Sequence, residues 1–456
     1  MTLTEKILAR AAGKAQVQAG DNVWVKADIL MTHDVCGPGT IGVFRREFGK
    51  NAKVWDRNRI VIIPDHYIFT ADSKSNRNVD ILREFVKEQQ VEYFYDVIDD
   101  PDGHWVFDAK QGQLKRQYGS NFAGVCHTAL PQKGHTRPGE ILFGTDSHTC
   151  MAGAFNEFAT GIGNTDAGFV MGTGRLLLKV PETMHFRLEG KLQPGLMAKD
   201  VILHCIGEIG FDGATYRAMQ FDGPATTHLS MDDRMTIANM AIEAGGKNGI
   251  FEFDAQTQAY VDYRCKLNGT KTTYEPVERD RDEKFVYELV VDLSRLEPVV
   301  ACHPDPGQRK LAKELTHIKL DRAYIGSCTG GKTSDFLDFA RLIRGKHVAI
   351  ATFGVPATPE IVRDLQAARW GDQTVWQILV EAGVQMTENA SCAACLGGPT
   401  DTFGRMNTPM KCISATNRNF PGRMGHKESQ VFLASPVTVA ASALTGKITD
   451  PREFLD

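Results

Sequence analysis

The sequence lacks the features that mark several large classes of proteins. It has no run of about 18 apolar residues, so we expect no transmembrane helix. Its net charge is −4 over 456 residues, and it has no basic stripe interleaved with aromatic residues, so nucleic-acid or membrane-surface binding is not expected. It also shows no internal repeat and no low-complexity tract. These absences indicate a soluble globular protein that attracts its ligand through local groups.

The amino terminus lacks the apolar core of a signal peptide. Residues 1–13 have the pattern of an amphipathic helix, and we expect the chain to stay in the cytoplasm. The ten cysteines are scattered rather than arranged as a disulfide framework, which suits a reducing compartment. Seven of them are interpreted mainly as small core or loop residues: Cys36, Cys126, Cys150, Cys205, Cys265, Cys302 and Cys412.

The other three cysteines lie beside glycine-rich turns. Cys392 and Cys395 have the C-x-x-C spacing that lets two thiolates of one tight loop bind the same metal centre. Cys328 follows a short apolar strand, and no fourth cysteine stands out. A closed structural zinc site uses four ligands, whereas a catalytic metal site keeps one position open, so three thiolates fit an open site. A redox pair, a zinc knuckle and plain buried cysteines remain alternatives on this evidence.

The loop that contains Cys328 ends in Gly330-Gly331-Lys332-Thr333, which resembles the end of a phosphate-binding loop. Because Cys328 occupies the turn, we interpret this segment as a cysteine loop. The glycine-rich and alanine-rich residues 153–174 are likewise interpreted as a region of close helix packing rather than a nucleotide loop.

Polar side chains repeatedly follow apolar stretches that are typical of strands. Expected strands at residues 22–28, 59–63, 124–127 and 140–144 are each followed by acidic or imidazole groups. In open α/β sheets, ligands bind beyond the carboxyl ends of the strands, so these groups are expected to converge on one crevice. The candidates are Asp65, His66, His127, Asp146 and His148, with His33 and Asp34 at a further strand exit.

The chain is predicted to form three α/β domains, at residues 1–180, 181–295 and 296–456. A fresh strand begins near Phe186, and the mixed-charge residues 274–284 are typical of a solvated boundary. Within the second range, Ser230 opens a helix with a capping-box pattern. Asn239 and Glu243 are four residues apart and are expected on one face of that helix, where buried and solvated positions are about equally plausible.

Two arginines follow the last expected strand, at Arg418 and Arg423, inside Asn-Arg-Asn-Phe-Pro-Gly-Arg. A guanidinium fork can hold both oxygens of a carboxylate in two hydrogen bonds. An open thiolate metal site beside such arginines indicates Lewis-acid chemistry on a small polycarboxylate.

Three motifs, in this order and spacing, resemble the aconitase superfamily, and within it most closely the large subunits of the isopropylmalate dehydratases. They are Gly-Ser-Cys-Thr-Gly-Gly-Lys-Thr at 326–333, Ser-Cys-Ala-Ala-Cys-Leu-Gly-Gly-Pro at 391–399, and Asn-Arg-Asn-Phe-Pro-Gly-Arg-Met-Gly-His-Lys at 417–427. The resemblance covers nearly the whole chain. It implies three aconitase-like α/β domains around a shared iron–sulfur active-site cleft, without the family's C-terminal swivelling domain.

The resemblance also implies the cofactor and the roles of individual residues. A [4Fe-4S] cluster is expected on Cys328, Cys392 and Cys395, with its fourth iron open to the substrate hydroxyl and a carboxylate. The Asp65-His66 pair is expected to protonate the departing hydroxyl. Further expected site residues are Asp146, Ser147 and His148 around the iron-bound water and substrate, His127, Asn239 and Glu243 in the pocket, Arg418 and Arg423 for carboxylate binding and pocket support, and, more loosely, His33.

The implied reaction is the isomerisation of 2-isopropylmalate and 3-isopropylmalate by dehydration and rehydration, a step of leucine biosynthesis. Single-chain members of the superfamily take their base, a serine, from a C-terminal domain that carries a Gly-Ser-Ser-Arg motif. This sequence contains no such motif and ends at Asp456. The base and part of the pocket are therefore expected on a separate small subunit, so the isolated chain is expected to be inactive.

Two other interpretations are compatible with the same motifs. A homoaconitase or another 2-alkylmalate isomerase would differ in the alkyl group, which the missing subunit contacts. A zinc-binding scaffold or an RNA-binding protein would need no turnover, although the acidic balance argues against RNA. A full-length aconitase is disfavoured by the missing C-terminal domain.

Overall fold

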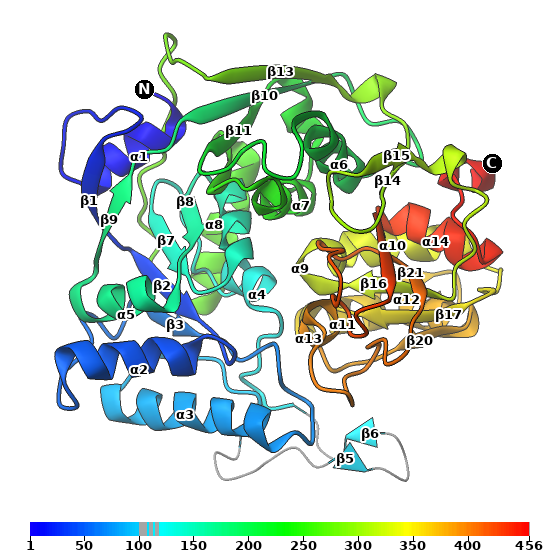
Figure 1. Cartoon of the computed structure of the whole chain (residues 1–456), viewed down its shortest axis with the longest axis horizontal. Helices are drawn as coiled ribbons and strands as arrows, with labels where there is room; N and C mark the ends of the chain where they lie inside the picture. Colours follow the sequence, from blue (N-terminus) through cyan, green and yellow to red (C-terminus); the bar gives the residue numbers. More distant parts are fainter. Residues whose placement is uncertain (100–106, 109–112, 115–117, 456) are drawn as a thin grey trace.

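The computed structural model describes residues 1–99, 107–108, 113–114 and 118–455. Three β-sheets with their helices follow one another along the chain (Figure 1). The first sheet has five parallel strands in the order β4-β3-β2-β7-β8. Their bounds are β2 Ile29–Thr32, β3 Ile60–Ile62, β4 Tyr93–Phe94, β7 Ile141–Gly144 and β8 Phe158–Gly161. The central strands are buried on both faces, as expected for a parallel sheet covered by helices.

Helices and one antiparallel strand pair surround this first sheet. Thr2 and Glu5 form a capping box at the start of the first helix, which lies within the predicted residues 1–13, and Asp72 caps the third helix. The elements are α1 Leu3–Ala11, α2 Gly37–Phe48, α3 Ser73–Gln89, α4 Cys126–Gln132, the 3₁₀ helix η1 Ser147–Phe155, α5 Asn164–Thr173, and the paired strands β1 Asn22–Lys26 and β9 Arg175–Lys179. A short antiparallel pair joins β5 Phe107–Asp108 and β6 Gln113–Leu114.

The second sheet has four parallel strands in the order β12-β11-β10-β13. They are β10 Thr183–Glu189, β11 Ala218–Asp222, β12 Asn248–Phe251 and β13 Tyr287–Asp292. The capping box at Ser230 and Asp233 is present as predicted. The helices are α6 Ala198–Ile209, η2 Pro224–His228, α7 Met231–Asn239, η3 Met240–Ala244, α8 Ala255–Asn268 and η4 Leu293–Arg295.

The third sheet is mixed and has seven strands in the order β15-β14-β22-β21-β16-β17-β20. The strands are β14 Val299–Ala301, β15 Arg309–Leu311, β16 Arg322–Gly326, β17 Ala351–Val355, β20 Val384–Met386, β21 Lys411–Ser414 and β22 Gln430–Ala434; a separate pair joins β18 Arg369–Trp370 and β19 Gln373–Thr374. The helices are η5 Ala312–Glu314, α9 Ser327–Gly330, α10 Thr333–Ile343, α11 Pro359–Ala367, α12 Val375–Glu381, α13 Ala393–Leu396, α14 Pro436–Thr445 and η6 Pro451–Phe454. The short helix α9 packs against α4 and α7 in the middle of the molecule (Figure 1).

The strands of the three sheets fall within the three predicted domain ranges. The clusters of buried hydrophobic side chains do not follow the three predicted domain ranges. One cluster of buried side chains runs continuously from Val125 and Phe155 through the second sheet into the third, and Val291 and Val299 on either side of the expected boundary belong to it. Two smaller clusters cover opposite faces of the first sheet, with Leu30 on one face and Met31 on the other. The division at 180 and 295 stays a prediction.

One predicted strand is wrong. Residues 124–127 do not form a strand, because helix α4 begins at Cys126. The backbone turns at Gly124, whose φ is +84° and where a Cβ would lie 2.4 Å from the carbonyl oxygen of Ala357. Cys126 then donates its backbone N–H to Asp65 Oδ2 at 2.7 Å. The apolar tripeptide that suggested a strand is thus a turn that leads into a helix.

The apolar residues 348–350 precede strand β17, which begins at Ala351. Among the described residues, no helix is both long enough and apolar enough to cross a membrane.

A candidate active site between the acid–imidazole edge and the cysteine loops

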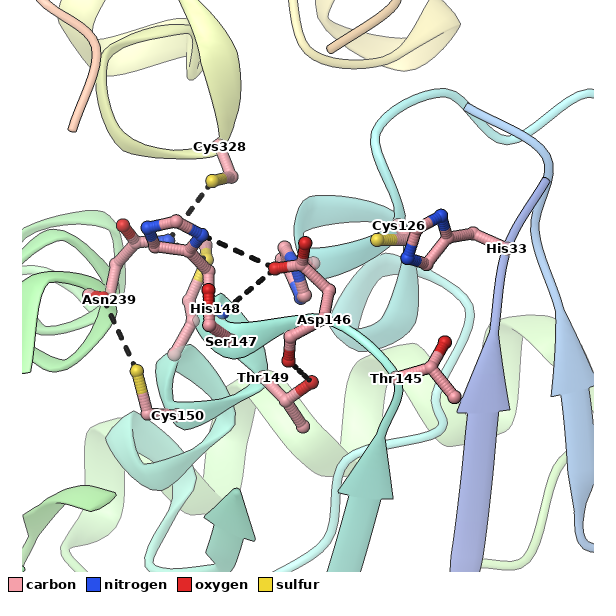
Figure 2. Close-up of polar contacts among 12 residues, drawn as sticks. His33, Cys126, Thr145, Asp146, Ser147, His148, Thr149, Cys150, Asn239 and Cys328 are labelled. Carbon is pink, nitrogen blue, oxygen red and sulfur yellow. Dashed lines mark hydrogen bonds and ion pairs between the residues drawn. The ribbon is translucent and has the colours of Figure 1, made fainter. Parts of the chain in front are cut away.

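Three neighbouring parallel strands of the first sheet, β3, β2 and β7, end at the same edge. His33 and Asp34 follow β2, Asp65 and His66 follow β3, and Asp146 follows β7. Figure 2 shows His33, Asp146 and His148 beyond these strand ends, with Cys328 approaching from the third sheet. The predicted convergence of strand exits is therefore present in the structure. We call the acidic and imidazole side chains at this edge the acid–imidazole edge. Its members are His33, Asp34, Asp65, His66, His127, Asp146, His148 and Glu243.

Asp34 holds the loop after β3 in place. Its Oδ1 accepts the backbone N–H groups of Asp65 (2.8 Å) and His66 (3.0 Å), and its Oδ2 accepts that of Tyr67 (2.6 Å). Asp34 is fully buried. Three N–H donors satisfy its carboxylate without solvent, so the backbone at the catalytic candidates is fixed by a side chain from the neighbouring strand.

Asp65 and His66 form a tight pair. The His66 Nδ1 and Asp65 Oδ1 atoms lie 2.6 Å apart. Burial alone would lower the pKa of His66, but the Asp65 carboxylate raises it to about 10. The ring of His33 stacks on that of His66 with centroids 4.3 Å apart, and burial together with the His66 charge lowers the pKa of His33. His66 is therefore protonated at neutral pH and His33 is not.

Asp146 contacts more than one imidazole of the acid–imidazole edge. Its Oδ1 contacts His127 Nε2 at 2.8 Å and His148 Nδ1 at 3.3 Å, and it accepts the backbone N–H of His148 at 2.8 Å. His66 Nε2 lies 3.9 Å from the other carboxylate oxygen. Burial would raise the pKa of Asp146, but the rings of His127 and His148 hold it well below its usual range. The Asp146 carboxylate is thus shared by the imidazoles of His66, His127 and His148, which come from three different segments.

A second carboxylate, Glu243, extends the edge towards the arginines. Glu243 Oε1 lies 2.8 Å from His148 Nε2 and accepts a hydrogen bond from Arg418 Nε at 2.8 Å. Arg418 Nη2 also donates to Ser147 Oγ at 3.0 Å. Burial opposes ionisation, but the Arg418 charge and the hydrogen bond with His148 lower the pKa of Glu243.

Asn239 and Glu243 do not lie on one continuous α-helix, contrary to the prediction from the sequence. Helix α7 ends at Asn239 and the chain continues as the 3₁₀ helix η3, and both residues are buried.

Cys328 sits on a sharp strand-to-helix turn between β16 and α9. Ser327 has a φ of +70°, an uncommon conformation for a non-glycine residue. At Gly330 a Cβ would lie 2.5 Å from the carbonyl oxygen of Ala415, so the turn packs closely against the end of β21. Asn239 Nδ2 donates to Cys328 Sγ at 3.1 Å (Figure 2). Thr329 Oγ1 donates to Asn239 Oδ1 at 2.8 Å. Burial raises the pKa of the Cys328 thiol to about 12.

Cys392 and Cys395 lie at the two ends of one helical turn around α13. A hydrogen bond from Cys392 lowers the pKa of Cys395 to about 5. Asn417 links this turn to Cys328, because its Oδ1 accepts from Cys395 Sγ at 3.3 Å and its Nδ2 lies 3.4 Å from Cys328 Sγ. The backbone N–H of Cys392 donates to the Asp65 carbonyl at 2.8 Å, which ties the turn to the acid–imidazole edge.

The three sulfur atoms are spread too widely for a single ion. In the described part of the chain, the groups of His, Cys, Asp and Glu whose ligand atoms all lie within 4.8 Å of one another are His33-Asp34-Asp65-His66 and His127-Asp146-His148, and the three cysteines form no such group. Thiolates on one zinc ion, each about 2.3 Å from the metal, would lie within about 4 Å of one another. The arrangement therefore fits a larger thiolate-bound group better than a mononuclear zinc.

Unpartnered donors surround the cysteines. Tyr324 Oη and Arg423 Nε are buried and have no hydrogen-bond partner among the residues that the structure describes, and Arg423 Nη2 lies 3.8 Å from Cys395 Sγ. The Tyr324 hydroxyl is close enough to Cys395 and Cys392 for their charges to raise its pKa, in addition to the effect of burial. Buried donors of this kind favour an acceptor among them. The residues fit a [4Fe-4S] cluster, whose inorganic sulfides accept hydrogen bonds.

The cysteine loop also has the spacing of a phosphate-binding loop, from Gly326 to Thr333. The structure excludes that use for Lys332, whose side chain is 2% exposed. Its Nζ donates to the Thr329 carbonyl and pairs with Asp335 Oδ2 at 2.8 Å. Because the glycine spacing from Gly326 matches the motif in full, spacing does not exclude a nucleotide loop here; the burial and pairing of Lys332 do.

Every residue predicted for the site lies in this region of the structure, but the contacts differ from those expected for two of them. Asn239 directs its amide to Cys328, and Arg418 is bound to Glu243 and Ser147. Sequence reasoning missed the contribution of Asn417, which bridges two cysteines. Asn417 follows β21, so the strand-exit rule that found Asp65 would have found it too.

The chain as a whole is similar to known proteins. The model of the aconitase family (aconitate hydratase) matches residues 5–314 and 308–446. The chain is 56% identical to the chloroplastic 3-isopropylmalate dehydratase large subunit of Arabidopsis thaliana, over 100% of this chain and 87% of that protein. It is 41% identical to 3-isopropylmalate dehydratase large subunit 1 of Methanopyrus kandleri (100% and 99% covered) and 40% identical to the large subunit of Aquifex aeolicus (100% and 98%).

A solved structure, the holo-form of Thermococcus kodakaraensis aconitase X, shows 12% identity and a TM-score of 0.47 over 91% of this chain and 88% of that one. This likeness is too weak to add to the sequence matches. The family model covers nearly the whole chain, and the matches to the Arabidopsis and Methanopyrus large subunits cover 100% of this chain. The chain therefore belongs to the aconitase family, in the branch of the 3-isopropylmalate dehydratase large subunits.

Proposed function

We propose that this chain is the cluster-bearing large subunit of a 3-isopropylmalate dehydratase, a hydro-lyase that interconverts 2-isopropylmalate and 3-isopropylmalate through 2-isopropylmaleate. One observation carries the proposal. A protonated imidazole on a buried carboxylate, Asp65-His66, is tied through the Asp65 carbonyl to Cys392, within the same buried region as the other two cysteines. An acid held beside a thiolate-bound Lewis acid is the combination that a dehydration needs.

Cys328, Cys392 and Cys395 would hold the [4Fe-4S] cluster. When bound, the cluster supplies a Lewis-acidic iron with a coordination position left for the substrate hydroxyl and a carboxylate. Asn239 and Asn417 fix the sulfur positions, since their side chains contact Cys328 from two sides. Burial of all three thiols keeps water from the ligands.

His66 is the proposed acid for the departing hydroxyl. Its Nδ1 is held by Asp65, so its Nε2 carries the proton that is transferred. Asp146 lies 3.9 Å from that Nε2. The Asp146 carboxylate therefore orients the water that is released and later re-added, while His127 and His148 stabilise its charge.

The substrate carboxylates are proposed to meet Ser147, Arg418 and Arg423. Arg423 has a buried Nε without a partner, so it has donor capacity left for a ligand. Arg418 is held in orientation by Glu243 and Ser147. His33, which is stacked on His66, would cover one side of the acid.

The strong base that removes the carbon-bound proton is proposed to come from a separate small subunit, as a serine. The relatives are named large subunits, which implies a partner subunit in those proteins. For this chain we propose the same division, in which the large subunit binds the cluster and the acid, and the small subunit supplies the base and the pocket for the isopropyl group.

The proposal can be tested by anaerobic purification of the chain, followed by iron, sulfide and zinc analysis and by assay with and without the small subunit. We expect about four irons and four sulfides per chain, a three-iron EPR signal after mild oxidation, and turnover only with the partner. Stoichiometric zinc without sulfide under conditions that preserve iron–sulfur clusters would contradict the proposal. So would turnover by the large subunit alone.

A further inference from the structure

Two lysines are buried one layer behind the cysteines, where the proposed chemistry does not use them. Lys199, in α6, is 1% exposed, and Lys332, before α10, is 2% exposed. Lysine is rarely buried unless its ammonium group is paired, because desolvation of a charge is costly. The two ammonium groups differ in the interactions that offset their desolvation.

Lys332 is neutralised within its own segment. Its Nζ pairs with the buried Asp335 at 2.8 Å and donates to the carbonyl of Thr329, the residue after Cys328. Asp335 also accepts the backbone N–H of Lys332. The Lys332-Asp335 pair therefore steadies the Cys328 turn without adding net charge.

Lys199 binds a different segment of the cysteine region. Its Nζ donates to the carbonyl of Thr416 at 2.5 Å. Thr416 precedes Asn417, whose side chain contacts both Cys395 and Cys328. Lys199 thus holds the segment that places Asn417 between the two sulfur atoms.

Within the described part of the chain, Lys199 has no carboxylate within ion-pair distance. Its neighbour Asp200 uses its two oxygens on the backbone N–H groups of Met197 and Val299. Burial lowers the pKa of Lys199 to about 7, whereas the charges of Asp335 and Cys395 favour its protonated form. A cluster on three thiolates is a large negative charge, and it would strengthen that preference.

We propose that Lys199 is a positioning residue for the cluster: it anchors the Thr416-Asn417 segment and places near the cysteine ligands an ammonium group that has no ion-pair partner among the described residues. The inference rests on the proposed function, since it assumes the cluster. A positive charge at this place favours the more negative, reduced form of the cluster and raises its midpoint potential. It also helps to retain the thiolate ligands in their deprotonated form.

The test compares variants of the full chain after anaerobic cluster reconstitution. Lys199→Met removes both the charge and the hydrogen bond, and Lys199→Arg keeps the charge. We expect Lys199→Met to bind iron and sulfide and to lose its labile iron faster than the unmodified chain. Its midpoint potential should be lower by about 59 mV, which corresponds to a tenfold change in the equilibrium constant of a one-electron reduction. Lys199→Arg should restore the potential.

A matched control separates charge from packing. Ile202→Val shortens a fully buried apolar side chain of the same helix, α6, with no change in charge, so its potential should stay close to that of the unmodified chain. An equal shift in this control, or an unchanged potential in Lys199→Met with a full cluster, would overturn the inference. Should Lys199→Met not fold, Lys199→Gln gives the same comparison, because it also removes the charge.

Failure of the inference is distinguishable from failure of the proposed function. If the unmodified chain contains no sulfide, the cluster assignment is wrong. If the unmodified chain contains the cluster, and the Lys199 variants have the same midpoint potential and EPR spectrum as the unmodified chain, the cluster assignment stands and the proposed role of Lys199 is wrong.

Discussion

The acid–imidazole edge and the cysteine loops differ in how their polar groups are satisfied. At the edge, Asp34 accepts three backbone N–H groups, and Asp146 and Glu243 are each shared by two or more cationic or imidazole partners. Around the cysteines, burial raises the pKa of the Cys328 thiol, and the Tyr324 hydroxyl and the Arg423 Nε have no hydrogen-bond acceptor within the described part of the chain.

This difference indicates two kinds of preorganisation. The carboxylates of the edge are satisfied by neighbouring groups, and among the described residues the only buried polar side-chain atoms of the edge without a hydrogen-bond partner are His33 Nε2 and His127 Nδ1, so its geometry depends less on a ligand. The cysteine loops leave donors for a group that is added later, so their stability is coupled to the cofactor. Variants that affect only one of the two regions can test this contrast.

The largest effect is expected from Cys395→Ser, which removes one ligand from the cysteine loops. Iron and sulfide content should fall to background and turnover with the small subunit should be lost, because a serine hydroxyl is a poor ligand for this cluster. Metal analysis and circular dichroism check this together. A chain that keeps its fold but lacks the cluster supports the contrast, and full cluster retention contradicts the ligand assignment.

His66→Ala acts on the edge instead. We expect the cluster to remain and turnover to fall by about 10²–10⁴-fold, since general acid catalysis contributes about that much. Steady-state assay with the small subunit and the EPR spectrum of the same sample check the two parts of the prediction. His317→Ala, at an exposed position outside the site, serves as the control. Near-normal turnover in His66→Ala would exclude His66 as the acid.

Glu243→Gln keeps the shape of the side chain but removes the charge between His148 and Arg418. We expect turnover to fall by about 10–100-fold, as for other residues that orient a metal site from outside its ligands. The cluster should remain. Separate measurement of kcat and KM shows whether the loss arises from the orientation of Arg418, which would mainly raise KM. An unchanged rate would mean that the Glu243 contacts are dispensable.

The smallest effect is expected from Asp34→Asn. An amide can accept fewer of the three backbone N–H groups, so we expect a loss of about 1–3 kcal/mol in the free energy of unfolding. Chemical denaturation of the chain with and without its cluster measures it. The loss should be the same in both forms if the edge is independent of the cofactor. A much larger loss in the cluster-bound form would break the contrast between the two regions.

The strand-exit rule accounts for what the sequence predicted well. Asp65, His66 and Asp146 were found because each follows a buried strand, and parallel neighbours end at one edge. His127 was placed in the site for the wrong local reason, since it lies in the first turn of α4 rather than after a strand. A short apolar segment does not distinguish a strand from a turn that enters a helix.

Other features had no signal in the local sequence. Lys199 reads as an ordinary helical lysine, and only the packing of α6 against the third sheet shows that its ammonium group is buried on the Thr416 carbonyl. The Gly326–Thr333 spacing reads as a phosphate loop, and only the burial of Lys332 shows that it is not used as one.

The sequence by itself determined the chemical groups of this protein: three cysteines at glycine-rich turns, acidic and imidazole residues at strand ends, and two arginines near the carboxyl terminus. Their spacing is enough to indicate Lewis-acid chemistry on a carboxylate substrate. The tertiary structure decided which of these groups touch, because the partners lie far apart in the chain, as Asp65 and Cys392 or His148 and Glu243 do. Protonation states follow from those contacts and from burial, and neither is set by local sequence.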